Sequence, residues 1–127
     1  MKLEEARPLN DEEKRILGTL LEPEFPGVEE LRAQVPHAVV VGCCDCGCPT
    51  VEFSVSPTAS RSNVKTWPRL APFEATVKPV ESEPPGEIIL FVDDGRLSCL
   101  EYVSYDDPSP REWPSPDRLN VAQVRTS

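Results

Sequence analysis

The sequence predicts an α+β domain in which two N-terminal helices pack on a mostly antiparallel sheet of four to five strands. Two segments near the start carry apolar residues at helical spacing. The later segments are β-branched, or alternate apolar with polar residues, and turn signals separate them. A chain of 127 residues can bury one hydrophobic core of working size. We therefore expect a single domain over residues 1–119.

The first helix is expected to begin after Asn10. This residue can cap the helix, and Glu13 stands three residues further on, in the capping-box position. The residues that follow form one apolar stripe at spacings of three and four; they are Ile16, Leu17, Leu20 and Leu21. This stripe predicts a helix that faces the core.

A second, short amphipathic helix is expected to open at Pro26 and to end before Pro36. One side is apolar and the other polar. The apolar side holds Val28, Leu31 and Val35, and the polar side holds Glu29, Glu30, Arg32 and Gln34.

The next two strands are expected to form a hairpin around a cysteine-rich turn. Residues 37–41 are a β-branched run, and residues 51–56 alternate apolar with polar side chains, which predicts a strand with one wet face. Between them, six residues hold four of the five cysteines; these are Cys43, Cys44, Cys46 and Cys48.

Three further strands are predicted. Residues 73–78 suit an edge strand, and residues 87–92 are apolar enough for a central strand that is covered on both faces. Asp-Asp-Gly at 93–95 then predicts a hairpin turn, in which Gly95 takes a positive φ. In the return strand, 96–105, period two places Leu97 and Cys99 on one face, so Cys99 is expected in the core.

The C-terminal part should wrap the domain. Residues 106–118 hold four prolines, which predicts an extended segment, and Trp113 and Leu119 are the side chains expected to dock it. From Asn120 the chain carries no clear pattern, and we expect a disordered tail over residues 120–127.

The charge of the chain bears on its partners. A net charge of −9 disfavours nucleic acid, whose phosphates bind clustered Lys and Arg, and it favours a basic protein partner. Residues 57–80 differ, with four bases against one acid.

The chain has no apolar run long enough to span a membrane and does not begin with the apolar core of a signal peptide, so we expect a cytoplasmic protein with reduced thiols and no membrane partner. The oligomeric state is left open.

The cysteine cluster allows three interpretations. Its residues can be small turn and strand side chains, or they can bind a soft metal. In the second case the candidate ligands are Cys43, Cys44, Cys46, Cys48 and His37, and zinc is the candidate metal. The spacing differs from structural zinc sites, which pair two separated cysteine knuckles, so no cofactor is the first expectation. A redox role is the third interpretation.

Catalysis has little support in the sequence. His37 is the only histidine, and a nucleophilic pair with Cys46 or Cys48 lacks an orienting third group. The chain also has no Gly-rich phosphate loop. We assign no catalytic residue.

Three features together carry a resemblance. They are an acidic start with two helices, the segment Cys-Asp-Cys-Gly-Cys-Pro-Thr-Val-Glu-Phe (44–53), and the segment Gly-Arg-Leu-Ser-Cys-Leu-Glu-Tyr-Val-Ser-Tyr-Asp (95–106) followed by Trp113-Pro114. On the basis of these features, residues 25–119 resemble a group of small uncharacterised bacterial α+β proteins. The acidic single-domain build is also similar to immunity proteins of bacterial toxin systems. The resemblance implies no activity.

Three functions follow as hypotheses. The first is a non-enzymatic interaction domain, immunity-like or regulatory, that binds a basic partner. The second is a metal-binding module that uses the cysteine cluster. The third is a thiol enzyme.

Overall fold

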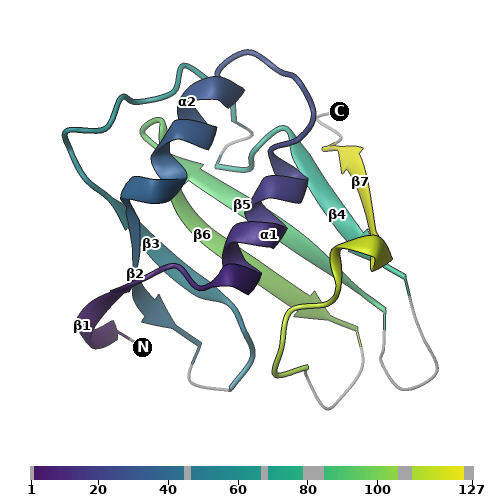
Figure 1. Cartoon of the computed structure of the whole chain (residues 1–127). Helices are drawn as coiled ribbons and strands as arrows, with labels where there is room; N and C mark the ends of the chain where they lie inside the picture. The colour runs from purple at the N-terminus through teal and green to yellow at the C-terminus, as the bar shows by residue number, and fades with distance from the viewer. Residues whose placement is uncertain (1, 45–46, 67–68, 79–84, 106–109, 125–127) are drawn as a thin grey trace.

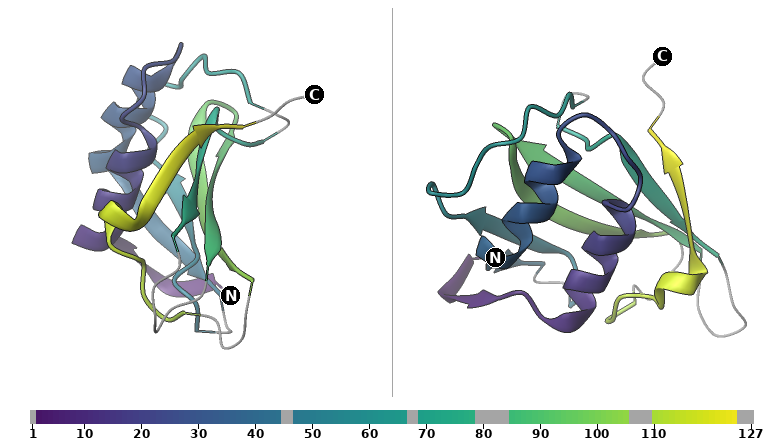
Figure 2. Two further views of the ribbon diagram at one scale, coloured as in Figure 1. Left: turned by 90° about the vertical axis from the view of Figure 1, so that its right-hand side faces the viewer. Right: turned by 45° about the horizontal axis from the view of Figure 1, so that its top comes forward.

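The computed structural model describes residues 2–44, 47–66, 69–78, 85–105 and 110–124. It has two layers, a seven-stranded sheet and a pair of helices that pack on one face of it (Figures 1 and 2). The strand order is β1-β2-β3-β6-β5-β4-β7, and every pairing is antiparallel. In chain order the elements are β1 (Lys2–Pro8), α1 (Asp11–Leu20), α2 (Val28–Gln34), the 3₁₀ turn η1 (Val35–His37), β2 (Ala38–Cys43), β3 (Val51–Val55), β4 (Phe73–Val77), β5 (Gly86–Asp93), β6 (Arg96–Ser104), the 3₁₀ turn η2 (Pro116–Arg118) and β7 (Leu119–Gln123). The predicted α+β class is confirmed.

The strand number was underestimated because both outer strands were missed. β1 precedes the helices and pairs with β2, and its side chains are mostly exposed on both sides, so it shows no alternation. β7 pairs with β4 along its whole length. Residues 120–123 are therefore in a strand, which corrects the expected disordered tail there. Residues 125–127 lie outside the described part of the chain.

The predicted cap of α1 is confirmed. The Asn10 side chain accepts a hydrogen bond from the Glu13 amide at 2.8 Å, and the Glu13 carboxylate accepts one from the Asn10 amide at 2.9 Å. Arg7 donates two more hydrogen bonds to that carboxylate, at 2.8 and 3.0 Å. The cap therefore also joins α1 to the end of β1.

The second helix begins later than expected and hides a polar residue. It starts at Val28, after Gly27 in the left-handed conformation, rather than at Pro26. Gln34, expected on the solvent side, is fully buried. Its amide donates to the carbonyls of Ser60 (2.9 Å) and Gly95 (2.8 Å), and it accepts from the Leu97 amide (2.9 Å). These bonds explain how a polar side chain lies among core residues.

Both predicted hairpins are present. β2 and β3 pair antiparallel on either side of the cysteine-rich turn. β5 and β6 are joined by Asp94 (φ 50°) and Gly95 (φ 73°), and two positive φ values define the tight turn that matches strand twist.

A β-bulge in β6 corrects the predicted position of Cys99. Phe91 pairs with Cys99 and Val92 with Leu97, so Ser98 is one extra residue in β6. The bulge shifts the alternation, and Leu97 joins the buried face. Cys99 instead lies on the opposite face and is half-buried.

That opposite face of the sheet is not covered by the helices, and we call it the open face (Figure 2, left). β5 alternates between buried side chains and half-buried ones on the open face, so the expectation that it is covered on both sides was wrong. β4 is also not an edge, because it lies between β5 and β7.

Residues 110–118, which we call the strap, precede β7 and run along the N-terminal half of α1 (Figure 1). Trp113 is buried and stacks on Tyr102, with ring centroids 5.8 Å apart. The predicted docking role of Trp113 is confirmed, and Leu119 also packs against the core. Neither described helix combines the length and the apolar character needed to cross a bilayer.

Candidate functional site

The cysteine loop, residues 43–50, closes the β2–β3 hairpin. The Cys44 amide donates to the Thr50 carbonyl at 3.3 Å, and the Gly47 amide donates to the Cys44 carbonyl at 3.4 Å. Cys43, Cys44 and Cys48 are half-buried, and no disulfide joins cysteines within the described part of the chain. Cys46 lies outside it.

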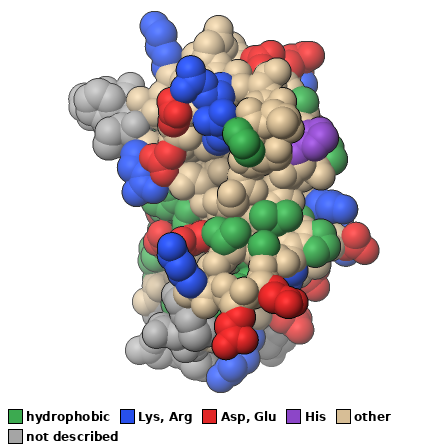
Figure 3. All heavy atoms as spheres, turned by 90° about the vertical axis from the view of Figure 1, so that its left-hand side faces the viewer, with side chains coloured by type: hydrophobic (Ala, Val, Ile, Leu, Met, Phe, Trp, Pro, Cys, Tyr) green, Lys and Arg blue, Asp and Glu red, His purple; other side chains and the backbone are tan. Residues whose placement is uncertain are grey.

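His37 is far from the loop along β2. It is exposed, and as the only histidine it is the purple side chain in Figure 3. His37 precedes the first residue of β2 and Cys43 ends the strand, so six residue steps of about 3.3 Å separate them by roughly 20 Å. The described residues contain no group of three or more His, Cys, Asp or Glu side chains that could hold a metal ion. Binding by the four clustered cysteines remains a prediction, since Cys46 is not described.

A hollow of about 220 Å³, which we call the thiol hollow, lies between the cysteine loop, the start of α1 and the strap. Cys43 and Cys48 both line it, and so do Arg7 and Arg111. No local pattern predicts that these residues meet, because the two arginines are more than a hundred residues apart.

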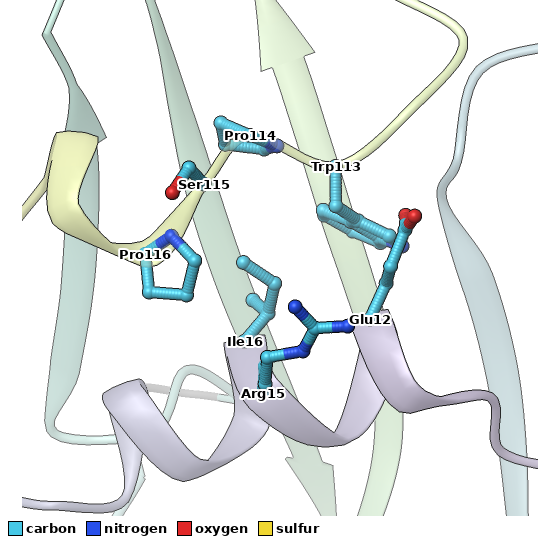
Figure 4. A pocket seen from close by; sticks show the side chains of 7 residues that line it. All are labelled: Glu12, Arg15, Ile16, Trp113, Pro114, Ser115 and Pro116. Atoms are coloured by element: carbon cyan, nitrogen blue, oxygen red, sulfur yellow. The ribbon is translucent and has the colours of Figure 1, made fainter.

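A second hollow of about 220 Å³ continues along α1 and shares Glu12 and Trp113 with the first. The strap residues from Trp113 to Pro116 face Glu12, Arg15 and Ile16 of α1 across it (Figure 4). Both hollows are lined by residues of α1 and of the strap.

The open face carries a different chemistry. By their strand register, its side chains are a mixture of half-buried apolar groups and carboxylates. The apolar ones on β5 and β6 are Ile89, Phe91 and Val103, and the carboxylates are Glu52, Glu74, Glu87 and Glu101. Within the described part of the chain, none of these four glutamates forms an ion pair with Lys or Arg.

Two of the glutamates flank Cys99. Glu52 pairs with Cys99 across the β3–β6 register, and Glu101 follows two residues later on the same face. Burial, followed by the charges of Glu101 and Glu52, raises the pKa of the Cys99 thiol to about 11. These residues and Phe91 line a hollow of about 350 Å³, the acidic hollow.

The other two glutamates lie near Tyr105, which is 56% exposed. The Tyr105 hydroxyl donates a hydrogen bond to Glu87, and this bond raises the pKa of the tyrosine to about 12. Burial and the neighbouring charge of Glu87 raise the pKa of Glu74 above its ordinary value. The open face therefore holds negative charges close to one another.

One arginine on this face is already neutralised. Arg69 donates two hydrogen bonds of 2.7 Å to Asp93, and this contact, with a hydrogen bond from Ser98, holds the pKa of Asp93 below its ordinary value. The guanidinium lies 5.3 Å from the centre of the Phe91 ring. The ring thus already accepts one guanidinium at the rim of the acidic hollow.

Sequence reasoning missed this surface for two reasons. The strand 87–92 was expected to be covered on both faces, and the bulge at Ser98 was not foreseen. A usable signal was present, because Glu52, Glu87 and Glu101 each stand in a strand beside residues that alternate toward the core.

The fold and these surfaces define a small acidic α+β domain with one helix-covered and one open sheet face. A scan against protein-family models found no match, and searches of curated proteins and of solved structures found no match either. The resemblance to small bacterial proteins therefore stays a prediction.

Proposed function

We propose that this chain is a non-enzymatic interaction domain, immunity-like or regulatory in role, that binds a basic protein through the open face of its sheet. The observation that carries the proposal is the set of four glutamates on that face, none of which has an ion-pair partner among the described residues. Around them lie half-buried apolar side chains. Apolar surface with charges of one sign suits a partner of opposite charge.

The close approach of like charges supports this choice of partner. Glu87 contributes to the raised pKa of Glu74, so the two carboxylates repel each other in the free protein. A Lys or Arg from a partner would turn this repulsion into attraction. Such complementary charges raise the association rate and discriminate against partners of the wrong charge.

The acidic hollow offers a place for one basic side chain. Glu52 and Glu101 lie in adjacent strands beside Phe91, so a guanidinium could meet the carboxylates while its methylene groups cover the ring. Arg69 makes this kind of contact with Phe91 from within the chain. An arginine-bearing partner is therefore the form of basic protein that fits best.

The test compares two variants of equal charge. E52Q/E74Q/E87Q/E101Q neutralises the open face, and E4Q/E5Q/E22Q/E30Q removes four glutamates outside β3, β4, β5 and β6 that form no ion pair among the described residues. Each changes the net charge from −9 to −5, since four negative charges are lost. Each protein is immobilised and exposed to extract of the native host at low ionic strength, and retained proteins are released with salt.

We expect the wild type and the control variant to retain the same basic protein, and the open-face variant to lose it. The affinity of that protein is then measured by calorimetry for all three chains. Equal retention by both variants would contradict the open face as the binding surface, and the absence of any retained basic protein would contradict the proposal as a whole.

A further inference from the structure

The thiol hollow brings two cysteines and two arginines together. Cys43 comes from the end of β2, Cys48 from the cysteine loop, Arg7 from the end of β1 and Arg111 from the strap. Both cysteines are half-buried and line the hollow, so a small molecule that enters it meets them. The hollow is independent of the open face and of the function proposed for it.

The two arginines differ in what they can still bind. Arg7 is committed to Glu13 at 2.8 Å, and its raised pKa reflects that bond first, with a smaller contribution from the charge of nearby Cys43. Arg111 forms no ion pair within the described residues. It is thus the cation that remains available to a ligand.

Arg111 also lies directly against the cysteine loop. A Cβ placed on Gly47 would be 3.0 Å from a guanidinium nitrogen of Arg111, and Gly47 precedes Cys48. Gly47 has a φ of 92°, so the absence of a side chain both permits this turn and leaves room for the guanidinium. Glu12 and Glu112 also line the hollow, so the local attraction for an anion comes from the position of Arg111 rather than from a net positive charge.

Cys99 provides a contrast within the same chain. It lies between Glu52 and Glu101, and burial and these charges keep it protonated over the neutral range. The cation nearest Cys99, Arg69, is already bound to Asp93, whereas Arg111 in the thiol hollow forms no ion pair within the described residues.

We propose that the thiol hollow is an S-thiolation site, at which Cys48 reacts with a small disulfide that carries carboxylates and Arg111 binds one of these carboxylates. After Cys48 loses its proton to solvent, its sulfur attacks one sulfur of the disulfide. The S–S bond of the reagent breaks, a new S–S bond joins Cys48 to one half, and the other half leaves as a thiolate that takes up a proton. The reagent is the oxidant, so no further reactant is needed.

The experiment uses oxidised glutathione as the probe, with bis(2-hydroxyethyl) disulfide as an uncharged reagent for comparison. Trypsin cleaves at Arg32, Arg61, Arg96 and Arg111, so the cysteine loop and Cys99 fall on different peptides, and fragmentation by mass spectrometry assigns the modified sulfur. Rates are measured for the wild type, for R111Q, and for K65Q, which removes an exposed positive charge away from the hollow.

We expect Cys48 to be modified first and Cys99 last. R111Q should slow the reaction with oxidised glutathione about threefold, the effect of losing one exposed ion pair, and should leave the reaction with the uncharged disulfide nearly unchanged. K65Q should match the wild type with both reagents. In a C44S/C46S background, with folding checked by circular dichroism, the preference for Cys48 should persist.

Three results would overturn the proposal. They are first modification at Cys99, equal rates for R111Q and the wild type with oxidised glutathione, and equal slowing of R111Q with both reagents. The last would show that the arginine shapes the loop but does not bind the reagent.

Discussion

Two glycines show how single residues shape this chain. Gly95 has a φ of 73°, and a Cβ placed on it would lie 2.5 Å from the Ser62 carbonyl oxygen. The Ser62 amide donates to the Gly95 carbonyl at 2.8 Å, so the loop before β4 packs directly on the β5–β6 turn. Gly18 is the opposite case, because a Cβ placed on it meets nothing within 4 Å.

These surroundings predict opposite signs for the same substitution. Gly95→Ala should lower the free energy of unfolding by about 1–3 kcal/mol, because it adds both a positive-φ strain and a clash with backbone. Gly18→Ala should raise that energy by up to about 1 kcal/mol, because alanine favours the helix and finds open space. Urea unfolding of both variants measures the difference. Destabilisation by Gly18→Ala, or a neutral Gly95→Ala, would contradict the geometry.

Among the elements, α2 depends on one buried side chain for its position. Gln34 reaches the loop at Ser60, the turn at Gly95 and the strand at Leu97, which are three separate parts of the chain. Each bond satisfies a backbone group in or near the core. The helix is therefore fixed on the sheet by directional contacts as well as by apolar packing.

Replacement of this side chain should be costly. Gln34→Leu should lower the free energy of unfolding by about 2–4 kcal/mol, because a buried amide and two carbonyls lose a partner. Gln34→Glu should be destabilising at neutral pH and partly recover as pH falls, since a carboxylate faces two carbonyl oxygens and a protonated carboxyl can donate to one of them. Its folded-state pKa would be raised, so stability is lost as pH rises through it.

The control for this prediction is Ala33→Leu, which adds an apolar side chain at the exposed neighbouring position. It should change stability by less than about 0.5 kcal/mol. A loss in Ala33→Leu equal to that in Gln34→Leu would assign the effect to the helix in general and not to the three hydrogen bonds.

The elements also show what sequence could and could not predict. The cap at Asn10, the cysteine hairpin and the turn at Gly95 were predictable because each depends on local chemistry. β1 was not, since its side chains are exposed on both sides and leave no periodicity. The bulge at Ser98 was not, because one extra residue is visible only against a paired strand. Gln34 follows Leu31 by three residues, so its position in the helix predicted a buried side chain. Its polarity predicted an exposed one, and the two signals disagreed.

The candidate surfaces were only half predictable for a related reason. The cysteine cluster could be predicted, because four cysteines lie within six consecutive residues. The approach of Arg7 and Arg111 to them, and the gathering of four glutamates on one face, arise from strand order and register. Those are long-range properties of the fold.

On the scale of the whole molecule, some charged side chains form ion pairs within the chain and others form none among the described residues. The basic segment 57–80 supplies Arg61 and Arg69, which bind Asp94 and Asp93 at 2.8 and 2.7 Å. The acidic β5–β6 turn is thereby neutralised within the chain. The glutamates of the open face have no such partner among the described residues, so they contribute to the net charge of −9 without internal compensation.

This division predicts a pH dependence that belongs to the open face. The pKa values of Glu74, Cys99 and Tyr105 are all raised, the last two to about 11 and about 12. A raised folded-state pKa means that the folded chain binds the proton more tightly than the unfolded chain. Stability contributed by these groups is therefore lost as pH rises, through Glu74 above its ordinary pKa of 4.5 and through Cys99 and Tyr105 above pH 9.

Urea unfolding at pH 5 and 7 tests the part of this dependence that belongs to Glu74, in the two charge variants described above. Because the face is partly exposed, each group should contribute less than about 1 kcal/mol. Between pH 5 and 7 the wild type and E4Q/E5Q/E22Q/E30Q should lose stability with the same slope. E52Q/E74Q/E87Q/E101Q should show a flatter profile and a higher free energy of unfolding at pH 7, because the mutual repulsion of the open face is gone. If the free energy of unfolding depended on pH in the same way for both variants, the repulsion would be spread over the whole surface. The open face would then not be distinguished as the surface that binds a basic partner.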